Sequence, residues 1–308
     1  MRCKSYLDCR GDLRLAVTDA AGALRDVTDV AVGDHRRSGI SPIRQFLERA
    51  GSWQELAAAA ATAGEAEVAT LLSPVPDPTK IVAAPVNYRD HQVEMSEDTA
   101  VDGLGVFLKA PSSLLPHGGT VRLPYHDRRF DQEGELAVVI GRRASKVRVD
   151  DALGVVAGYT CLLDMTMRGG EDRSVRKSFD TFTPAGPQLV TADEVGPVGD
   201  LELRTWVGGR IRQEAKLSNL IWNVPRLVAY VSSVMVLLPG DLLATGTPAG
   251  VGPVGDGDEI VLEITNVGRL CVTVSSTAAL ACPTNGGGRG PVPPRWYEPR
   301  LQGRAEEV

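Results

Sequence analysis

The sequence predicts a mixed α/β fold that is rich in β-strands, with a small α/β domain at the amino-terminal end. Glycine (33) and proline (20) are both above average, which favours a chain with many turns. Beyond residue 80, short apolar runs alternate with turns that contain Gly, Pro or Asp, a pattern typical of sheets. A proline-rich stretch at residues 73–78 separates this region from the residues before it.

Residues 1–72 are expected to form the small α/β domain. The alternating apolar residues Leu13, Leu15 and Val17 predict a strand. Residues 43–63 predict one or two helices, since the alanine-rich stretch within them has strong helix propensity. Residues 73–79 are then expected to be a linker, because each proline removes a hydrogen-bond donor and fixes the backbone.

Residues 80–277 are expected to form the main domain, and residues 278–308 a flexible tail rich in Pro and Gly. Apolar runs in the main domain predict strands at residues 81–84, 136–140, 153–163, 188–191, 201–207, 242–245, 259–264 and 270–274. One helix is predicted at residues 218–237, where apolar residues recur at intervals of three and four, and Pro225 either kinks it or lies near its start.

Composition excludes several classes of partner. A formal net charge of -6 and a pI near 5.4 argue against nucleic acid, because phosphate binding depends on clustered Lys and Arg. No segment approaches the roughly 18 uninterrupted apolar residues of a membrane span, so no membrane partner is expected. Residues 1–14 are charged and lack the apolar centre of a secretory signal, which predicts a cytoplasmic protein. The five dispersed cysteines favour reduced thiols.

Three acidic residues are candidates for a metal site. Glu133 and Glu135 stand two apart at the head of an apolar run, so on a strand they project from the same face. Such a pair alone more often lies on a solvated edge. Asp164 ends a long apolar run, where a buried carboxylate requires a cation or hydrogen bonds, although a turn or N-cap role is the ordinary alternative. Together the three would form an oxygen cage suited to Mg²⁺ or Mn²⁺.

Other residues could transfer protons or bind anions. His91 and Glu94 share a face if their segment is helical, and the Glu could then orient the imidazole to activate water; a surface pair is the alternative. Lys109 and Lys177 lie near aromatic residues, where an ammonium could bind a carboxylate or an enolate, unless it is simply solvated. The Gly-rich segment 240–252 could approach an anion with backbone N–H groups, and a plain turn explains it equally well.

Six segments resemble the fumarylacetoacetate hydrolase family in their sequence and in their order: KIVAAPVNYRDH, VFLKAPSSL, FDQEGELAVVIG, VAGYTCLLDMTMR, KSFDTFTPAGP and GDLLATGTPAGVG. The resemblance spans about residues 80–274 and identifies residues 80–277 as the catalytic domain. It implies a β-roll core, a homodimer, and Mg²⁺ or Mn²⁺ bound by Glu133, Glu135 and Asp164. The remaining roles that it implies are catalysis by His91, Glu94 and Lys177, and substrate binding by Lys109, Arg168 and Thr247.

One segment departs from the family pattern. After the metal-binding Asp many members have Asp and Gln at positions where this chain has Gly169 and Glu171. In hydrolytic members the Gln is expected to hold the attacking water or the oxyanion. An ionised Glu cannot donate a hydrogen bond, so this difference points to a changed reaction or substrate.

The resemblance implies hydrolysis of a C–C bond in a small 1,3-dicarbonyl oxo-acid of the acylpyruvate type. Two alternatives use the same site: decarboxylation of an oxaloacetate-type acid and isomerisation of a 2-hydroxymuconate-type diene. A non-catalytic relative that binds a metabolite is a third, from a different class, and the changes at Gly169 and Glu171 are its only support.

Overall fold

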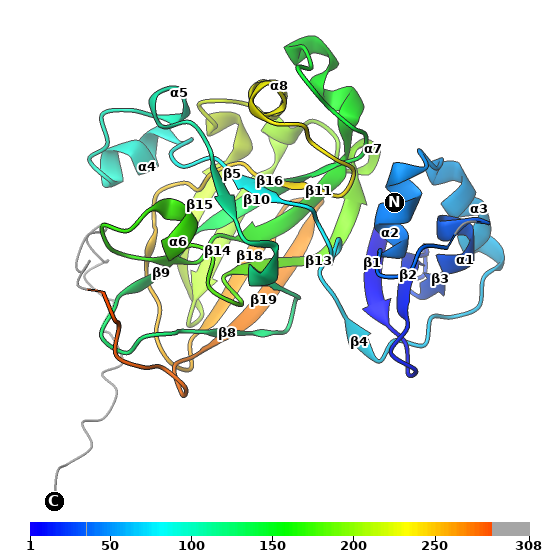
Figure 1. Ribbon diagram of the computed structural model, residues 1–308, viewed down its shortest axis with the longest axis horizontal. Coiled ribbons are helices and arrows are strands. Elements are labelled where there is room, and N and C mark those ends of the chain that lie inside the picture. Colours follow the sequence, from blue (N-terminus) through cyan, green and yellow to red (C-terminus); the bar gives the residue numbers. More distant parts are fainter. Residues whose placement is uncertain (35, 285–308) are drawn as a thin grey trace, which may run out of the picture.

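The computed structural model describes residues 1–34 and 36–284, and strands dominate it (Figure 1). The largest sheet has eleven strands. Its main path runs in the order β3 (Leu24–Asp26), β2 (Leu13–Thr18), β1 (Arg2–Leu7), β13 (Thr183–Thr191), β11 (Val156–Leu163), β10 (Gly134–Ile140), β16 (Leu242–Ala244), β5 (Ile81–Ala83) and β6 (Phe107–Lys109). Two short strands lie off this path: β4 (Thr70–Leu71) pairs with β1, and β7 (Leu114–Leu115) pairs with β13.

Two smaller sheets complete the main body. One has five strands in the order β15 (Arg210–Lys216), β14 (Glu202–Val207), β18 (Glu259–Ile264), β19 (Gly268–Ser275) and β8 (Thr120–Arg122). The other has three, in the order β12 (Thr166–Met167), β9 (Phe130–Gln132) and β17 (Gly252–Pro253). Strands β10, β11 and β13 pack against β14, β18 and β19, and the apolar core between them includes Leu136, Leu163, Leu203, Leu262 and Leu270.

The amino-terminal residues form strands β1–β4 with helices α1 (Thr28–Val32), α2 (Pro42–Glu48) and α3 (Trp53–Thr62), and all three helices pack on β2. The predicted strand at residues 13–17 is therefore confirmed, and the one or two helices predicted at residues 43–63 are two, α2 and α3. These strands do not form a separate sheet. Strand β1 is antiparallel to β13, with Cys3 opposite Leu189, so the unit extends the sheet of the main body.

The remaining helices are short. They are α4 (Arg89–Glu94), α5 (Val101–Leu104), α6 (Arg173–Arg176), α7 (Ala192–Val195) and α8 (Val224–Val234), with 3-10 turns at Pro111–Ser113, Val149–Val155, Val198–Asp200 and Leu217–Asn219. The predicted helix at residues 218–237 is wrong at both ends. The side chain of Asn223 accepts from Arg226 N and caps α8, with Pro225 in the first turn, and Met235 is already extended.

Each apolar run that predicts a strand contributes to one, but residues 153–155 belong to a 3-10 turn and β11 begins only at Val156. Strand β15 was not predicted because its sequence, RIRQEAK, lacks an apolar run. Of the predicted tail, residues 278–284 lie along the main body, where Leu280 bridges to Tyr125; residues 285–308 lie outside the described residues. No helix in the described ranges is long and apolar enough to cross a bilayer.

Candidate active site

The three candidate metal ligands converge because of the pairing of β10 with β11. Glu133 directly precedes β10, Glu135 is its second residue, and Asp164 directly follows β11. The backbone N–H of Asp164 donates to Glu133 O at 2.8 Å, which sets the two chain segments side by side. One carboxylate oxygen from each residue lies within 4.8 Å of the others, and all three side chains are buried. The structure thus forms the acidic cluster that the sequence predicts.

The charge of this cluster calls for a cation. Burial raises the pKa of Glu135 well above its usual range, and the charge of Asp164 raises it further. Burial also acts on Glu133, but Lys177 and Arg168 outweigh it and hold the pKa of Glu133 well below its usual range. Three buried carboxylates offer only hard oxygen ligands, the set that Mg²⁺ and Mn²⁺ prefer. The residues present therefore fit a divalent cation.

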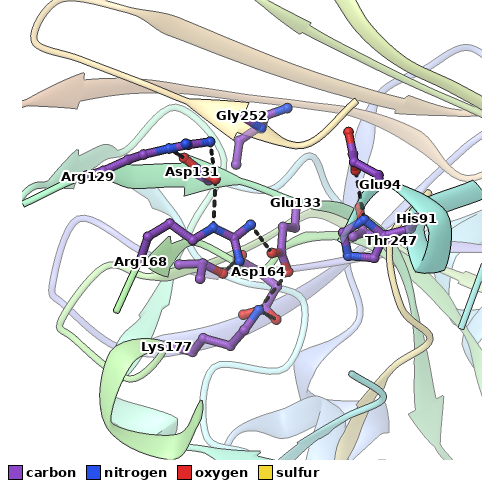
Figure 2. Close-up of polar contacts among 12 residues, drawn as sticks. His91, Glu94, Arg129, Asp131, Glu133, Asp164, Arg168, Lys177, Thr247 and Gly252 are labelled. Carbon is purple, nitrogen blue, oxygen red and sulfur yellow. Dashed lines mark hydrogen bonds and ion pairs between the residues drawn. The ribbon is translucent and has the colours of Figure 1, made fainter. Parts of the chain in front are cut away.

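Lysine and arginine side chains surround the acids (Figure 2). Lys177 Nζ lies 2.6 Å from Glu133 Oε2 and 2.5 Å from Asp164 Oδ2, so its ammonium bridges two of the three acids. Lys109 Nζ pairs with Asp164 Oδ1 and donates to Phe182 O at 2.9 Å. A carboxylate oxygen that accepts one hydrogen bond keeps a lone pair, so these contacts leave the acids able to bind a cation.

Asp131 and Arg129 extend the network of ion pairs around the acidic cluster, and the sequence analysis did not predict either residue. Arg168 Nη2 donates to Glu133 Oε1 at 2.8 Å, and its Nε donates to Asp131 Oδ2 at 2.7 Å. Asp131 is fully buried and also pairs with Arg129, whose Nε lies 2.8 Å from Oδ1. Arg168, predicted to bind substrate, is thus fixed by two acids. The available signal was the spacing of the acids, because Asp131 stands two residues before Glu133, which stands two residues before Glu135.

Helix α4 presents His91 and Glu94 as a pair. Nδ1 of the buried His91 lies 2.9 Å from Glu94 Oε2, and Glu94 Oε1 accepts from Gly250 N at 2.9 Å. These contacts fix the imidazole and fasten α4 to the Gly-rich segment. His91 lies close enough to the acids for its charge to help lower the pKa of Glu133. The predicted His91–Glu94 pair is therefore present and lies beside the acidic cluster.

The Gly-rich segment 240–252 holds the acids rather than an external anion. The backbone N–H of Gly246 donates to Glu135 Oε2 at 2.7 Å, so the expected anion contact is made to a carboxylate of the chain itself. Thr247 Oγ1 donates to Gly134 O at 3.0 Å and accepts from Gln213 Nε2 at 2.7 Å. The hydroxyl that was expected to contact substrate therefore already anchors this segment to β10, and Gln213 is a contributor that the sequence did not indicate.

Asn87 links the segment that leads into α4 to the backbone beside the acidic cluster of Glu133, Glu135 and Asp164. The sequence analysis did not predict this role. Its fully buried amide donates to Trp222 O at 2.9 Å and to Thr245 O at 2.8 Å, and accepts from Trp222 N at 2.7 Å. Thr245 directly precedes Gly246, which binds Glu135. One side chain thus links the start of the α4 segment to the backbone that supports a candidate ligand.

Replacing Asn87 with Ala is expected to lower the free energy of unfolding by about 2–4 kcal/mol, because three buried backbone groups lose their partner. Urea denaturation followed by circular dichroism measures this. The matched control is Asn223→Ala, which removes only the exposed cap of α8 and should cost about 1 kcal/mol. Equal losses in the two variants would show that Asn87 has no special anchoring role.

Glu171 binds the C-terminal segment. Its two carboxylate oxygens each accept from Arg128 at 2.9 Å, and Thr284 Oγ1 donates to Oε1 at 2.7 Å. These hydrogen bonds, led by that from Arg128, lower the pKa of Glu171 to about 2. The anionic state that the sequence analysis expects therefore agrees with the structure. The carboxylate is occupied in holding residues 278–284 against the domain.

Glu171→Gln is expected to loosen this segment, because the amide cannot form the two charge-assisted bonds to Arg128. Amide exchange of residues 278–284, measured by mass spectrometry at pH 7, should become faster. Since the folded pKa of Glu171 is depressed, its contribution is complete above about pH 5 and is lost as the pH falls toward 2. Glu263→Gln, which breaks an exposed pair with Arg269, should leave that exchange unchanged.

Fold and site together define a class of protein: a strand-rich α/β body around a buried carboxylate centre suited to a divalent cation, with a His–Glu pair beside it. The family model for the fumarylacetoacetate (FAA) hydrolase C-terminal domain matches residues 80–275. The chain belongs to the fumarylacetoacetate hydrolase family.

Individual relatives agree with this assignment. A maleylpyruvate hydrolase from Aquipseudomonas alcaligenes is 46% identical over 217 residues, which cover 67% of this chain and 76% of the relative. The crystal structure of maleylpyruvate hydrolase from Sphingobium sp. SYK-6 in complex with manganese (II) ion and pyruvate is similar with a TM-score of 0.77 and 36% identity, covering 90% of this chain and 99% of that one. A 4-hydroxyphenylacetate degradation bifunctional isomerase/decarboxylase from Salmonella dublin is 42% identical over 195 residues, 62% of this chain and 45% of the relative.

Proposed function

We propose that this protein is a divalent-metal-dependent hydrolase that cleaves a C–C bond in acylpyruvates, small 1,3-dicarbonyl oxo-acids. The observation that carries the proposal is the buried cluster of Glu133, Glu135 and Asp164, with the His91–Glu94 pair beside it. The similarity to two maleylpyruvate hydrolases supports the substrate class, and the manganese in one of them supports Mg²⁺ or Mn²⁺ as the cofactor.

Glu133, Glu135 and Asp164 would hold a divalent cation, which would attract the anionic 2-oxo-acid end of the substrate to this part of the site. A bound Mg²⁺ or Mn²⁺ supplies Lewis-acid polarisation of the substrate's oxo and carboxylate oxygens. Lys177 and Lys109 keep their ammonium groups against the acids, where they can stabilise negative charge that develops on the substrate. Arg168, fixed by Asp131 and Glu133, keeps the acidic side chains in place.

His91 activates the water. The hydrogen bond from Nδ1 to Glu94 leaves Nε2 free to take a proton, and the carboxylate stabilises the imidazolium that results. The oxygen of the water attacks the carbonyl carbon at C4, and the bond between C3 and C4 breaks. The electron pair moves to C3, giving the enolate of pyruvate, and the proton taken by His91 returns to that carbon. The products are one carboxylic acid and pyruvate, so atoms and charge balance.

Decarboxylation or isomerisation is the second candidate function. The bifunctional isomerase/decarboxylase among the relatives favours it. Decarboxylation of an oxaloacetate-type acid needs stabilisation of an enolate but no water, and isomerisation needs only proton transfer. Since Lys177, together with a cation that the acidic cluster would hold, would stabilise an enolate without help from His91, the same centre could support these reactions.

A substrate panel tests the proposal. Acetylpyruvate, maleylpyruvate, oxaloacetate and a 2-hydroxymuconate-type diene are each assayed with Mn²⁺ and with EDTA. We expect acylpyruvates to release pyruvate with Mn²⁺ and not with EDTA. Binding without consumption of any member would favour a non-catalytic relative instead, and turnover of the diene alone would favour an isomerase.

The family resemblance adds a β-roll main domain and a homodimer to the proposal. The sequence pattern adds a small α/β domain at residues 1–72, whose strand β1 pairs with the main sheet, and the composition adds a cytoplasmic location with no nucleic-acid or membrane partner. The resemblance likewise supports roles for Lys109, Arg168 and Thr247 in substrate binding. Light scattering on the purified full chain tests the dimer directly.

A further inference from the structure

Gln132 lies directly beside a candidate metal ligand but takes no part in the reaction proposed above. It ends β9 and immediately precedes Glu133. Its side chain is fully buried, and both the nitrogen and the oxygen of its amide form hydrogen bonds. Nε2 donates to Gly250 O at 3.0 Å, and Oε1 accepts from Gly252 N at 3.1 Å. Because one buried amide binds two backbone groups of the same short segment, it fixes that segment against β9.

The segment that Gln132 holds also binds the His–Glu pair. The backbone N–H of Gly250 donates to Glu94 Oε1 at 2.9 Å, and Glu94 Oε2 lies 2.9 Å from Nδ1 of His91 (Figure 2). Within residues 1–34 and 36–284, the bond to Glu94 is the one hydrogen bond between α4 and a part of the chain distant in sequence. The position of α4 therefore depends on where Gly250 lies.

The backbone at Gly250 needs support from outside its own segment. Its φ of +97° lies in the region that favours glycine, the residue that loses most conformational freedom on folding. A Cβ added there would lie 1.8 Å from Arg212 O in β15, so only glycine fits between the two chain segments. The hydrogen bond from Gln132 to Gly250 O holds this glycine from the side of β9.

We propose that Gln132 is a positioning residue, which sets the place of His91 relative to the metal ligands. This inference rests on the proposed function and adds a residue to it. Hydrogen bonds lead from Gln132 through Gly250 and Glu94 to His91, so two consecutive residues of the chain serve the two halves of the site. The water that His91 activates has to reach a substrate held at the acidic cluster. A displacement of about 1 Å can slow such a step about 100-fold.

Proton NMR of the Mg²⁺-loaded full chain tests the position of the imidazole directly. The proton between Nδ1 of His91 and Glu94 should give a downfield signal, which is assigned by its loss in His91→Ala. Gln132→Met replaces the amide with an apolar side chain of similar length. We expect it to broaden or abolish the signal, because Gly250 then no longer holds Glu94 in one place and the proton exchanges with water.

Gln188→Met is the matched control. Gln188 is buried in β13, and its Nε2 donates to Val267 O at 3.1 Å. The same change therefore removes a buried hydrogen bond between a Gln side chain and the backbone at another place, and the signal of His91 should persist. If Gln132→Met fails to fold, Gln132→Asn takes its place, since the shorter amide stays polar but cannot reach both glycines.

Kinetics separate positioning from support of the metal ligands. Gln132→Met should lower kcat for acylpyruvate hydrolysis by about 10- to 100-fold. The affinity for Mg²⁺, measured by calorimetry, should change less than about threefold, because Glu133 keeps its bonds to Lys177 and Arg168. In a Glu94→Ala background, where Gly250 no longer holds α4, Gln132→Met should lower kcat by less than about threefold.

Three outcomes would each overturn the proposal. They are a signal that persists in Gln132→Met, a signal that is lost in Gln188→Met, and a fall in Mg²⁺ affinity that matches the fall in kcat. The NMR signal requires no turnover. If the substrate panel shows no hydrolysis, the spectra therefore still decide whether Gln132 holds His91 in place.

Discussion

Replacing Glu135 with Gln is expected to weaken both metal binding and hydrolysis strongly while leaving the fold intact. Removing a residue that only hydrogen-bonds to a metal ligand already lowers the affinity for the metal by about 10- to 100-fold. Removing the charge of a ligand itself should therefore lower that affinity by at least about 100-fold. Activity should fall by about 10³-fold, because Lewis-acid stabilisation contributes several kcal/mol. Calorimetric titration with Mn²⁺ and a pyruvate-release assay measure the two effects.

The same substitution should act in the opposite direction on the metal-free protein. Glu135 is buried beside Asp164 and Glu133, which raise its pKa, and a neutral amide removes that repulsion. The amide oxygen can still accept from Gly246 N. In EDTA, the melting temperature of Glu135→Gln should therefore equal or exceed that of the unaltered protein. Glu259→Gln, at an exposed position on β18, is the control and should change neither metal affinity nor activity. Full activity of Glu135→Gln would show that the ligand set is wrong.

His91→Ala is expected to separate the reactions. Hydrolysis should fall by about 10²- to 10⁴-fold, the range for loss of a general base. Oxaloacetate decarboxylation, if the protein supports it, should change less than threefold, because that reaction requires no activated water. Initial rates with acetylpyruvate and with oxaloacetate at saturating Mn²⁺ give the comparison.

Two further variants sharpen this test. Glu94→Gln can still accept from Gly250 N but cannot stabilise an imidazolium, so its loss of hydrolysis should be smaller than that of His91→Ala. Asp90→Asn alters the same helix at an exposed residue and keeps an oxygen for His91 N, so it should leave both rates unchanged. If His91→Ala reduces both reactions equally, the histidine serves the centre as a whole rather than the water.

The parts of the fold that the sequence predicted are those in which a local pattern coincides with burial. Strand β10 is buried at every position, and its apolar run was sufficient to identify it. Strand β15 could not be found, because its polar sequence becomes a strand only by pairing with β14. The helix predicted at residues 218–237 was too long because apolar spacing ignored the cap that Asn223 provides. Strand β1 pairs with β13, which lies nearly 190 residues later in the chain, and no local sequence pattern predicts that pairing.

Site residues were predictable where several signals agreed. Glu133 and Glu135 share a strand face, and Asp164 ends the neighbouring strand, so spacing and resemblance gave the same answer. Asn87 and Gln213 were missed because neutral amides carry no charge signal, and their function is to bind backbone and hydroxyl groups distant in sequence. Thr247 was expected to face the substrate, but its hydroxyl binds Gly134 O, a contact that depends on the three-dimensional fold.

The position of β1 at the side of β13 has a practical consequence for protein engineering. Removing residues 1–72 to obtain a minimal enzyme would take β1 away from β13 and leave the backbone donors and acceptors near Leu189 and Val190 exposed to solvent. Such a bare edge readily recruits a strand from another molecule. A shortened version should therefore precipitate or form large assemblies during purification, even though every residue proposed for the chemistry is retained.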